Sequence, residues 1–237
     1  MAKLQGRGNC LTCPIRYRSI FSAIPKEQLP DVIGDFRTSV MTFEPNEPIY
    51  TEGDTAAHTY TLRKGLIKLT KSLADGRTQI VNIIGHGQLF GFDGLADENY
   101  NHTALALTDC EICKLPMKDL ERIRASNPSV DKAMMQGWIQ SLRAAENMLL
   151  DLGAKKAPER LASFLLKWCK DKEPGQWIDL PMSRTEIAEL LGLTIETVSR
   201  FLSDWKRKGY IQNTRSSIKL TDPEGLKKAI CSSSRGS

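Results

Sequence analysis

The chain has 237 residues, of which 41% are hydrophobic and 26% are charged. This composition is typical of a globular protein and excludes a disordered one, and the length suffices for one large domain or two smaller ones. No apolar run approaches the roughly 18 residues of a membrane helix. The opening MAKLQGRGNCLTCP also lacks the apolar segment of a secretory signal, so we expect a cytoplasmic protein without a membrane partner.

The formal net charge of +5 is unevenly distributed. Residues 153–237 hold 16 Lys and Arg against 10 Asp and Glu, whereas residues 1–152 hold 17 against 18. Basic side chains neutralise phosphates and release counterions, so the excess in the C-terminal third favours a polyanionic partner there.

Residues 1–18 form a polar leader that carries Cys10 and Cys13 in a CxxC pair, and Cys110 and Cys113 repeat that spacing. Thiols in a cytoplasmic protein are reduced, so two such pairs suggest a metal site rather than disulfides. If residues 110–113 form a strand, however, Cys110 and Cys113 face opposite sides of the sheet. A bulge would be needed to bring them together.

The segment 19–126 is expected to form a β-roll. Between residues 40 and 116, short alternating or apolar runs are separated by Gly, Asp or Asn. The sequence ADGR at 74–77 predicts a hairpin, since Asp-Gly suits a turn with positive φ. Short strands at such regular spacing indicate a β-sandwich or a jelly-roll-like β-roll.

A long helix is predicted over residues 127–153, with Pro128 in its first turn and Gly153 at the end of the pattern. Apolar residues recur at alternating spacings of three and four, as in the seam of a two-stranded coiled coil. We therefore expect a homodimer whose seam holds Met135, Trp138, Leu142, Ala145, Leu149 and Leu152. Alternatively, the helix lies on the core of its own domain, and the two roles can belong to different faces.

Residues 154–237 are expected to form a winged helix-turn-helix domain. Ser183, with Glu186 three residues later, forms a capping box that starts one helix, and Gly192 suits the left-handed turn that ends it. Thr194 then caps a second helix. Two short helices joined by a brief turn containing Gly are typical of a helix-turn-helix motif.

The second of these helices carries a polar stripe opposite its apolar residues. The stripe holds Glu196, Ser199, Arg200 and Ser203, at i, i+3, i+4 and i+7. A recognition helix presents such a face to the major groove, where Arg pairs with O6 and N7 of guanine and Glu accepts from N4 of cytosine. The alternative is an ordinary surface ion pair between Glu196 and Arg200. The basic excess favours the first interpretation, with double-stranded DNA as the partner.

A hairpin, GYIQNTRSSIKLTD, follows the recognition helix as a wing. Candidate phosphate contacts on or beside these elements are Arg184, Thr185, Lys206, Arg207 and Arg215. Thr194, at the start of the recognition helix, completes the predicted DNA-binding set. For each of these residues taken singly, a solvated surface role is the alternative.

A β-roll, a long helix and a winged helix-turn-helix in this order resemble the CRP/FNR transcription regulators over roughly residues 18–230. The resemblance implies an α+β fold with a cyclic-nucleotide-binding-like N-terminal domain, and RNA polymerase as a further partner. The stretch LGLTIETVSRFL resembles the recognition helix of the FNR branch, in which Glu196, Ser199 and Arg200 would read TTGAT half-sites of a palindrome. Ile195 stands where CRP itself has an Arg, which favours a TTGA-type over a GTGA-type half-site.

Three classes of effector follow from the resemblance, and cyclic AMP is the one it disfavours. In the family a Gly-Glu pair holds the ribose and an Arg-Ser pair holds the phosphate. Here Phe92 falls where the Glu should be, and His102 and Thr103 fall where Arg and Ser should be. A cyclic phosphate would lose its charge partner.

An iron–sulfur cluster, as in FNR, is the second class and needs four cysteines. Cys10, Cys13 and Cys113 match three of them, but the remaining position falls on Ser19 or Phe21. Cys110 could substitute for the missing ligand. A relic of a lost site, or buried apolar cysteines, is the alternative.

We favour the third class, a small organic ligand such as an aromatic acid held between the roll and the long helix. Candidate lining residues are Tyr60, Arg63, Phe90, Phe92, His102 and Trp138. Binding would shift the long helix and so the separation of two recognition helices. A ligand-free or thiol-redox regulator also stays open. The chain has no G-x-S-x-G, P-loop or HExxH motif, so we do not expect an enzyme.

Overall fold

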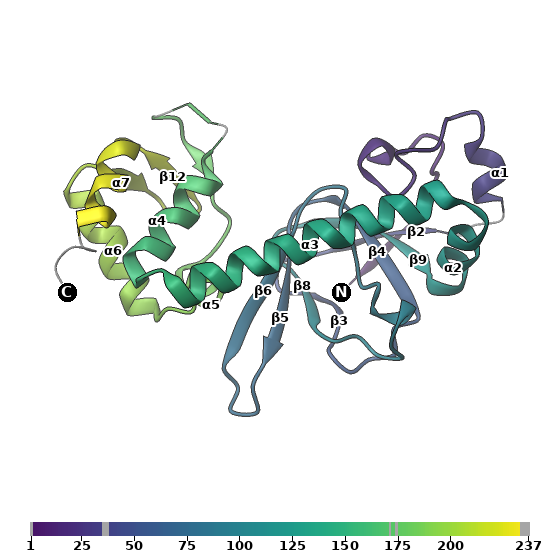
Figure 1. Cartoon of the computed structure of the whole chain (residues 1–237), viewed down its shortest axis with the longest axis horizontal. Helices are drawn as coiled ribbons and strands as arrows, with labels where there is room; N and C mark the ends of the chain where they lie inside the picture. The colour runs from purple at the N-terminus through teal and green to yellow at the C-terminus, as the bar shows by residue number, and fades with distance from the viewer. Residues whose placement is uncertain (1, 35–37, 171, 174, 233–237) are drawn as a thin grey trace. The chain divides into compact units, whose positions relative to one another are not determined.

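The computed structural model describes residues 2–34, 38–170, 172, 173 and 175–232, and it divides into two compact units, Met1–Ala145 and Glu146–Ser237. The α+β fold expected from the sequence is confirmed. The long helix α3 (Pro128–Ala154) is unbroken, begins in the first unit and ends in the second (Figure 1). In the part of the chain that the structure describes, no helix combines the length and hydropathy that crossing a bilayer requires.

Two antiparallel sheets build the first unit. One has the order β1 (Lys3–Arg7), β2 (Ser39–Phe43), β9 (Cys110–Pro116), β4 (His58–Lys64) and β7 (Leu89–Phe90). The other has the order β3 (Pro48–Tyr50), β8 (Thr103–Ala106), β5 (Ile67–Ser72) and β6 (Thr78–Ile84). The hairpin predicted at 74–77 joins β5 to β6, and Gly76 has the positive φ of 86° that the Asp-Gly turn requires.

Aromatic side chains fill the space between the two sheets. The rings of Tyr50 and Tyr100 stack with centroids 3.8 Å apart, and Tyr60 stacks on Phe90 at 5.3 Å. Stacked rings of this size bury a large apolar area and so contribute strongly to the stability of the roll. The interior of the roll is therefore packed with the protein's own side chains.

A second core cluster lies where short helices and the start of α3 cover the first unit. The elements involved include α1 (Leu29–Ile33), η2 (Asp93–Leu95) and α2 (Met117–Ser126), and Ile20 and Phe21 join them just after the short helix η1 (Arg16–Arg18). Leu120, Val130 and Met134 are buried in this cluster, and Trp138 packs against it. The first half of α3 is thus held by the roll of its own chain.

Strand β9 contributes to both clusters because its side chains alternate. Cys110 and Ile112 lie in the cluster between the sheets, whereas Cys113 and Leu115 lie in the second cluster. The opposite orientation of Cys110 and Cys113 that a regular strand predicts is therefore observed.

The second unit is a small helical domain with a three-stranded antiparallel sheet. Its elements are α4 (Ala157–Trp168), β10 (Ile178–Asp179), α5 (Arg184–Leu191), α6 (Ile195–Arg207), β11 (Ile211–Asn213), β12 (Ser217–Leu220) and α7 (Pro223–Ser232), with sheet order β10-β12-β11. The fully buried side chains of Leu161, Leu165 and Val198 belong to its core.

The local signals that predicted the helix-turn-helix motif are all present. The Ser183 hydroxyl accepts from the backbone N–H of Glu186 at 3.2 Å, and the Glu186 carboxylate accepts from the Ser183 N–H at 2.8 Å. Gly192 adopts a left-handed conformation, with φ 59° and ψ 45°. The Thr194 hydroxyl accepts from the Thr197 N–H at 3.2 Å, which fixes the start of α6.

Candidate nucleic-acid interface and associated sites

Helix α6 has one buried face and one polar face. The buried face holds Val198, Leu202 and Trp205. The polar face holds Glu196, Ser199, Arg200 and Ser203, of which Ser199 is half-buried and the others are exposed. The apolar face fixes the helix on its domain, so its polar side chains are presented to solvent in a fixed order.

Glu196 lies in the first turn of α6, where backbone N–H groups are free to donate. Hydrogen bonds from its own N–H and from the Thr194 side chain lower the pKa of Glu196 below its ordinary value. The carboxylate is therefore ionised at neutral pH and acts only as an acceptor. That is the state in which it could accept a hydrogen bond from an amino group such as N4 of cytosine.

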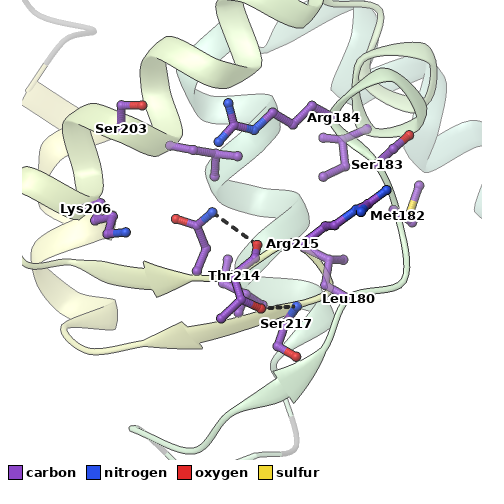
Figure 2. Close-up of a pocket in the computed structure, with 13 residues that line it drawn as sticks. Leu180, Met182, Ser183, Arg184, Ser203, Lys206, Thr214, Arg215 and Ser217 are labelled. Carbon is purple, nitrogen blue, oxygen red and sulfur yellow. Dashed lines mark hydrogen bonds between the residues drawn. The ribbon is translucent and has the colours of Figure 1, made fainter.

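A cavity of about 530 Å³ lies beside the polar face of α6. Its walls come from the start of α5, from α6 and from the β11–β12 hairpin, and Figure 2 shows Arg184, Lys206 and Arg215 extending from these three elements. Ser203 and Ser217 add hydroxyl groups, and none of the described residues that line it is acidic. Such a lining of cations and hydroxyls suits a phosphate backbone.

Arg184 links the two helices of the motif. Its Nη1 donates to the Ser199 Oγ at 3.0 Å, so the start of α5 is tied to the polar face of α6. Thr185, the next residue of α5, is exposed. Arg207 lies further along α6 and is paired with Asp204 at 2.6 Å, so it is occupied within the helix. It does not line the cavity, in contrast to Lys206.

The hairpin tip is ordered by its own side chains. The Thr214 hydroxyl accepts from the Ser217 N–H at 3.1 Å, and Arg215 is exposed between them (Figure 2). Asn213, Thr214 and Ser217 line the cavity, but sequence reasoning selected only Arg215 from this segment. The signal that could have found them is the run of polar residues NTRSS at a hairpin tip beside a recognition helix.

Comparisons with known proteins decide the family. Residues 159–229 match the Crp-like helix-turn-helix domain, and residues 40–127 match the cyclic nucleotide-binding domain. The nitrogen fixation regulation protein FixK of Bradyrhizobium diazoefficiens is 32% identical over 219 residues, which are 90% of this chain and 90% of FixK. The chain belongs to the CRP/FNR family of transcription regulators.

Further CRP/FNR relatives cover nearly the same extent. The transcriptional activator protein FnrL of Cereibacter sphaeroides is 32% identical over 213 residues, 85% of this chain and 83% of FnrL. The solved structure of FixK2 from Bradyrhizobium japonicum matches with a TM-score of 0.73 and 31% identity, over 81% of this chain and 96% of that one. The protein is therefore a DNA-binding transcription regulator with an effector-binding domain, and not an enzyme.

The long helix of this CRP/FNR regulator carries an exposed apolar stripe. Met135, Leu142 and Leu149 are 51%, 60% and 71% exposed, and Ala145 is exposed as well. Ile139 and Leu150 are also exposed, at 43% and 61%.

Two members of the predicted seam also contact other parts of their own chain, and the seam itself stays a prediction. The Trp138 ring lies 5.7 Å from the ring of Phe92, against the roll. Leu152 is half-buried and lies beside Gly192, since a Cβ atom on that glycine would stand 3.2 Å from Leu152 Cδ2. The α-helical period of 3.6 places Trp138 on the side of the stripe, so its contact with Phe92, and not the period, turns its ring toward the roll, whereas Ile139 stays exposed.

The predicted effector-lining residues lie in different surroundings, and their role in binding stays a prediction. Tyr60 and Phe90 are only 5% and 1% exposed and belong to the aromatic core. Arg63 is paired with Glu111 at 2.7 Å, and His102 Nε2 lies 2.7 Å from the Tyr50 hydroxyl. The rings of Tyr60 and Phe90 themselves fill the space between the sheets, which is why they are buried.

Phe92 and Trp138 do border a cavity of about 220 Å³ between the roll and the first half of α3. Arg18 from the N-terminal segment and Gln136 from α3 lie in the same lining. This cavity therefore places aromatic rings beside a cation and side-chain amides.

The cysteines do not form the four-ligand set of an FNR-type cluster. Cys10, Cys13 and Cys113 line one small cavity, together with Ser19 at a position where a fourth cysteine would be needed. Cys110 does not substitute, because it is in the other core cluster and its thiol donates to the Leu66 carbonyl at 3.0 Å. Among the described residues, no group of three or more His, Cys, Asp or Glu is placed to hold a metal ion. The residues present therefore do not fit the cluster.

Burial also keeps the thiols of Cys10 and Cys113 protonated. Desolvation, with Cys113 and Cys13 as neighbours, raises the pKa of Cys10 to about 12, and burial raises the pKa of Cys113 as well. The thiolate is the reactive form of cysteine, so both side chains behave as buried apolar groups at neutral pH.

Proposed function

We propose that the protein is a cytoplasmic homodimeric regulator that reads an inverted repeat of TTGAT half-sites. Its parts would be a leader (1–18), a β-roll that receives the effector (19–126), a dimerisation helix (127–153) and a winged helix-turn-helix domain (154–237). The observation that carries the proposal is the polar face of α6 beside a basic cavity. The activator named among its relatives also supports RNA polymerase as a partner.

The half-site is read, in this proposal, by three side chains on the first two turns of α6. Arg200 would pair with O6 and N7 of guanine, and Glu196 would accept from N4 of cytosine. Ser199, held by Arg184, would contact a neighbouring base or phosphate. Arg184, Lys206 and Arg215 would bind the phosphates that flank these bases, which fixes the orientation of the helix in the groove.

Dimerisation would use the exposed stripe of Met135, Ile139, Leu142 and Leu149. Apolar side chains exposed at heptad-like spacing are stabilised when a second helix covers them. A two-fold dimer then presents two recognition helices to half-sites whose centres lie about 34 Å apart, one turn of DNA.

The effector would be a small organic molecule, such as an aromatic acid, in the cavity bordered by Phe92 and Trp138. The two rings offer a stacking surface, and Arg18 offers a partner for a carboxylate. Because α3 forms one wall, a ligand there would act on the dimerisation helix directly. This is the route by which the roll would alter DNA affinity.

Arg200→Ala tests the reading of the half-site. Loss of one bidentate guanine contact costs about 1–3 kcal/mol, and a dimer on a TTGAT inverted repeat loses two, so affinity for the repeat should fall by at least about 30-fold. Fluorescence anisotropy with labelled duplexes would measure it at fixed salt. Arg122→Ala, which removes an exposed arginine from α2, is the matched control and should leave affinity unchanged. Equal affinity of the Arg200→Ala and Arg122→Ala proteins for the repeat would contradict the proposal.

A further inference from the structure

Arg160, on the first turn of α4, donates hydrogen bonds to four backbone carbonyls. Its Nε donates to Lys155 at 3.0 Å, and its Nη2 donates to Leu152 at 2.6 Å. Its Nη1 donates to Leu191 at 3.2 Å and to Gly192 at 3.3 Å. A single side chain therefore joins the end of α3, the α3–α4 connection and the turn of the helix-turn-helix motif.

These carbonyls lie at the C-terminal ends of two helices. Leu152 is in the last turn of α3, Leu191 is the last residue of α5, and Gly192 is its C-cap. Carbonyls in a last turn lack intrahelical donors and carry the negative end of the helix dipole. A guanidinium offers five N–H donors in a rigid planar fork, so it can satisfy both ends at once where an ammonium cannot.

Packing around Arg160 leaves little room between the two helix ends. A Cβ atom on Gly192 would stand 3.2 Å from Leu152 Cδ2 and 3.5 Å from Arg160 Nη1. Lys155 adds a second connection, since its Nζ lies 2.6 Å from Asp151 at the end of α3 and 3.0 Å from the Ser163 hydroxyl on α4. All of these residues belong to the unit Glu146–Ser237.

We propose that Arg160 is a positioning residue that fixes the last turn of α3 to the turn preceding the recognition helix. The end of the dimerisation helix and α6 then move as one body. The inference rests on the proposed function, because the consequence for DNA is that the end of α3 sets the separation of the two recognition helices. Residues that touch bases contribute to the affinity for a single half-site. Arg160 contributes instead to the affinity for two half-sites at a fixed separation.

The first test compares an inverted repeat of TTGAT with a duplex that holds one half-site. In Arg160→Met, we expect affinity for the repeat to fall about tenfold, within the usual range of coupling between sites, and affinity for the single half-site to change less than about threefold. Arg122→Met is the control and should change neither. An equal loss on both duplexes, or no loss on either, would overturn the proposal.

The second test does not depend on dimerisation or on DNA. Hydrogen exchange of the full-length protein, read by mass spectrometry, should quicken in Arg160→Met at both helix ends, in peptides over residues 150–157 and 190–195, with α2 unchanged. Faster exchange at one end only, or at neither, would overturn the positioning role. If Arg160→Met does not fold, Arg160→Lys serves instead, because an ammonium keeps the charge but cannot span both ends. A wild-type protein that binds one half-site as tightly as the repeat would refute the proposed dimer, while hydrogen exchange would still decide the role of Arg160.

Discussion

Two arginines organise the DNA-binding unit through directed hydrogen bonds of their side chains. Arg184 binds the Ser199 hydroxyl on the recognition face, and Arg160 binds four carbonyls behind it. Arg160 uses the planar fork of the guanidinium, which an ammonium does not have. An Arg-to-Lys change at this position is therefore not conservative, although it preserves the net charge.

His102 gives the roll a dependence on pH. It lies beside the Tyr50 hydroxyl, with Asp93 at 3.9 Å, and Lys71 and Glu52 act on it from a distance. Burial lowers the pKa of His102, although the Asp93 carboxylate opposes that shift. The unfolded chain therefore takes up this proton at a higher pH than the folded one does. Stability contributed by neutral His102 is lost as the pH falls from about 6.5 through the lower folded-state pKa.

We expect the thermal midpoint of the wild type to decrease between about pH 7.5 and 5.5, and His102→Gln to make that decrease smaller. Differential scanning fluorimetry at several pH values would measure both. His86→Gln, at an exposed histidine, is the matched control and should retain the wild-type decrease. If His102→Gln and His86→Gln show the same dependence on pH, burial of His102 is not the cause of the decrease in thermal midpoint.

Among the elements, helix α3 shows what a periodic pattern predicts and what it does not. Its existence and length follow from the spacing of its apolar residues, and the heptad pattern predicts most residues of its exposed apolar face. The orientation of Trp138 does not follow, because it depends on Phe92 and the roll, which are distant in sequence. The burial of Tyr60 and Phe90, which the sequence suggested as effector-lining residues, has the same cause. Packing between the two sheets places both rings in the core.

Ile139→Asp tests the stripe that the structure exposes. Burying two carboxylates in a symmetric helix seam is unfavourable, so we expect the variant to be a monomer by light scattering at concentrations where the wild type is a dimer. Ala144→Asp adds the same charge at an exposed position off the stripe and should leave the dimer intact. A dimeric Ile139→Asp protein would show that the stripe is not the seam.

In the helix-turn-helix motif, all features that depend on residues close in sequence could be predicted. The capping box of Ser183 and Glu186, the left-handed Gly192 and the Thr194 cap each involve residues within four positions of one another. Strand alternation likewise predicts that Cys110 and Cys113 face apart. The four bonds of Arg160 could not be predicted, because they join carbonyls up to 32 residues away through tertiary packing.

At the scale of the whole molecule, the charge distribution separates the DNA-binding part from the β-roll part. Residues 153–237 hold 16 Lys and Arg against 10 Asp and Glu, and the first 152 residues are nearly neutral. The basic part contains the recognition helix and the cavity lined by Arg184, Lys206 and Arg215. The nearly neutral part contains the roll, whose inter-sheet core is filled, and a cavity lined by Phe92 and Trp138 against α3.

The central claim is that a dimer of this chain reads TTGAT half-sites with one face of α6. The most direct measurement is selection of bound duplexes from a fully randomised DNA pool by the wild-type protein, followed by sequencing. We predict enrichment of an inverted repeat of TTGAT whose half-site centres lie about one helical turn apart. Enrichment of a GTGA-type repeat, of a single unpaired half-site or of no sequence at all would contradict the account.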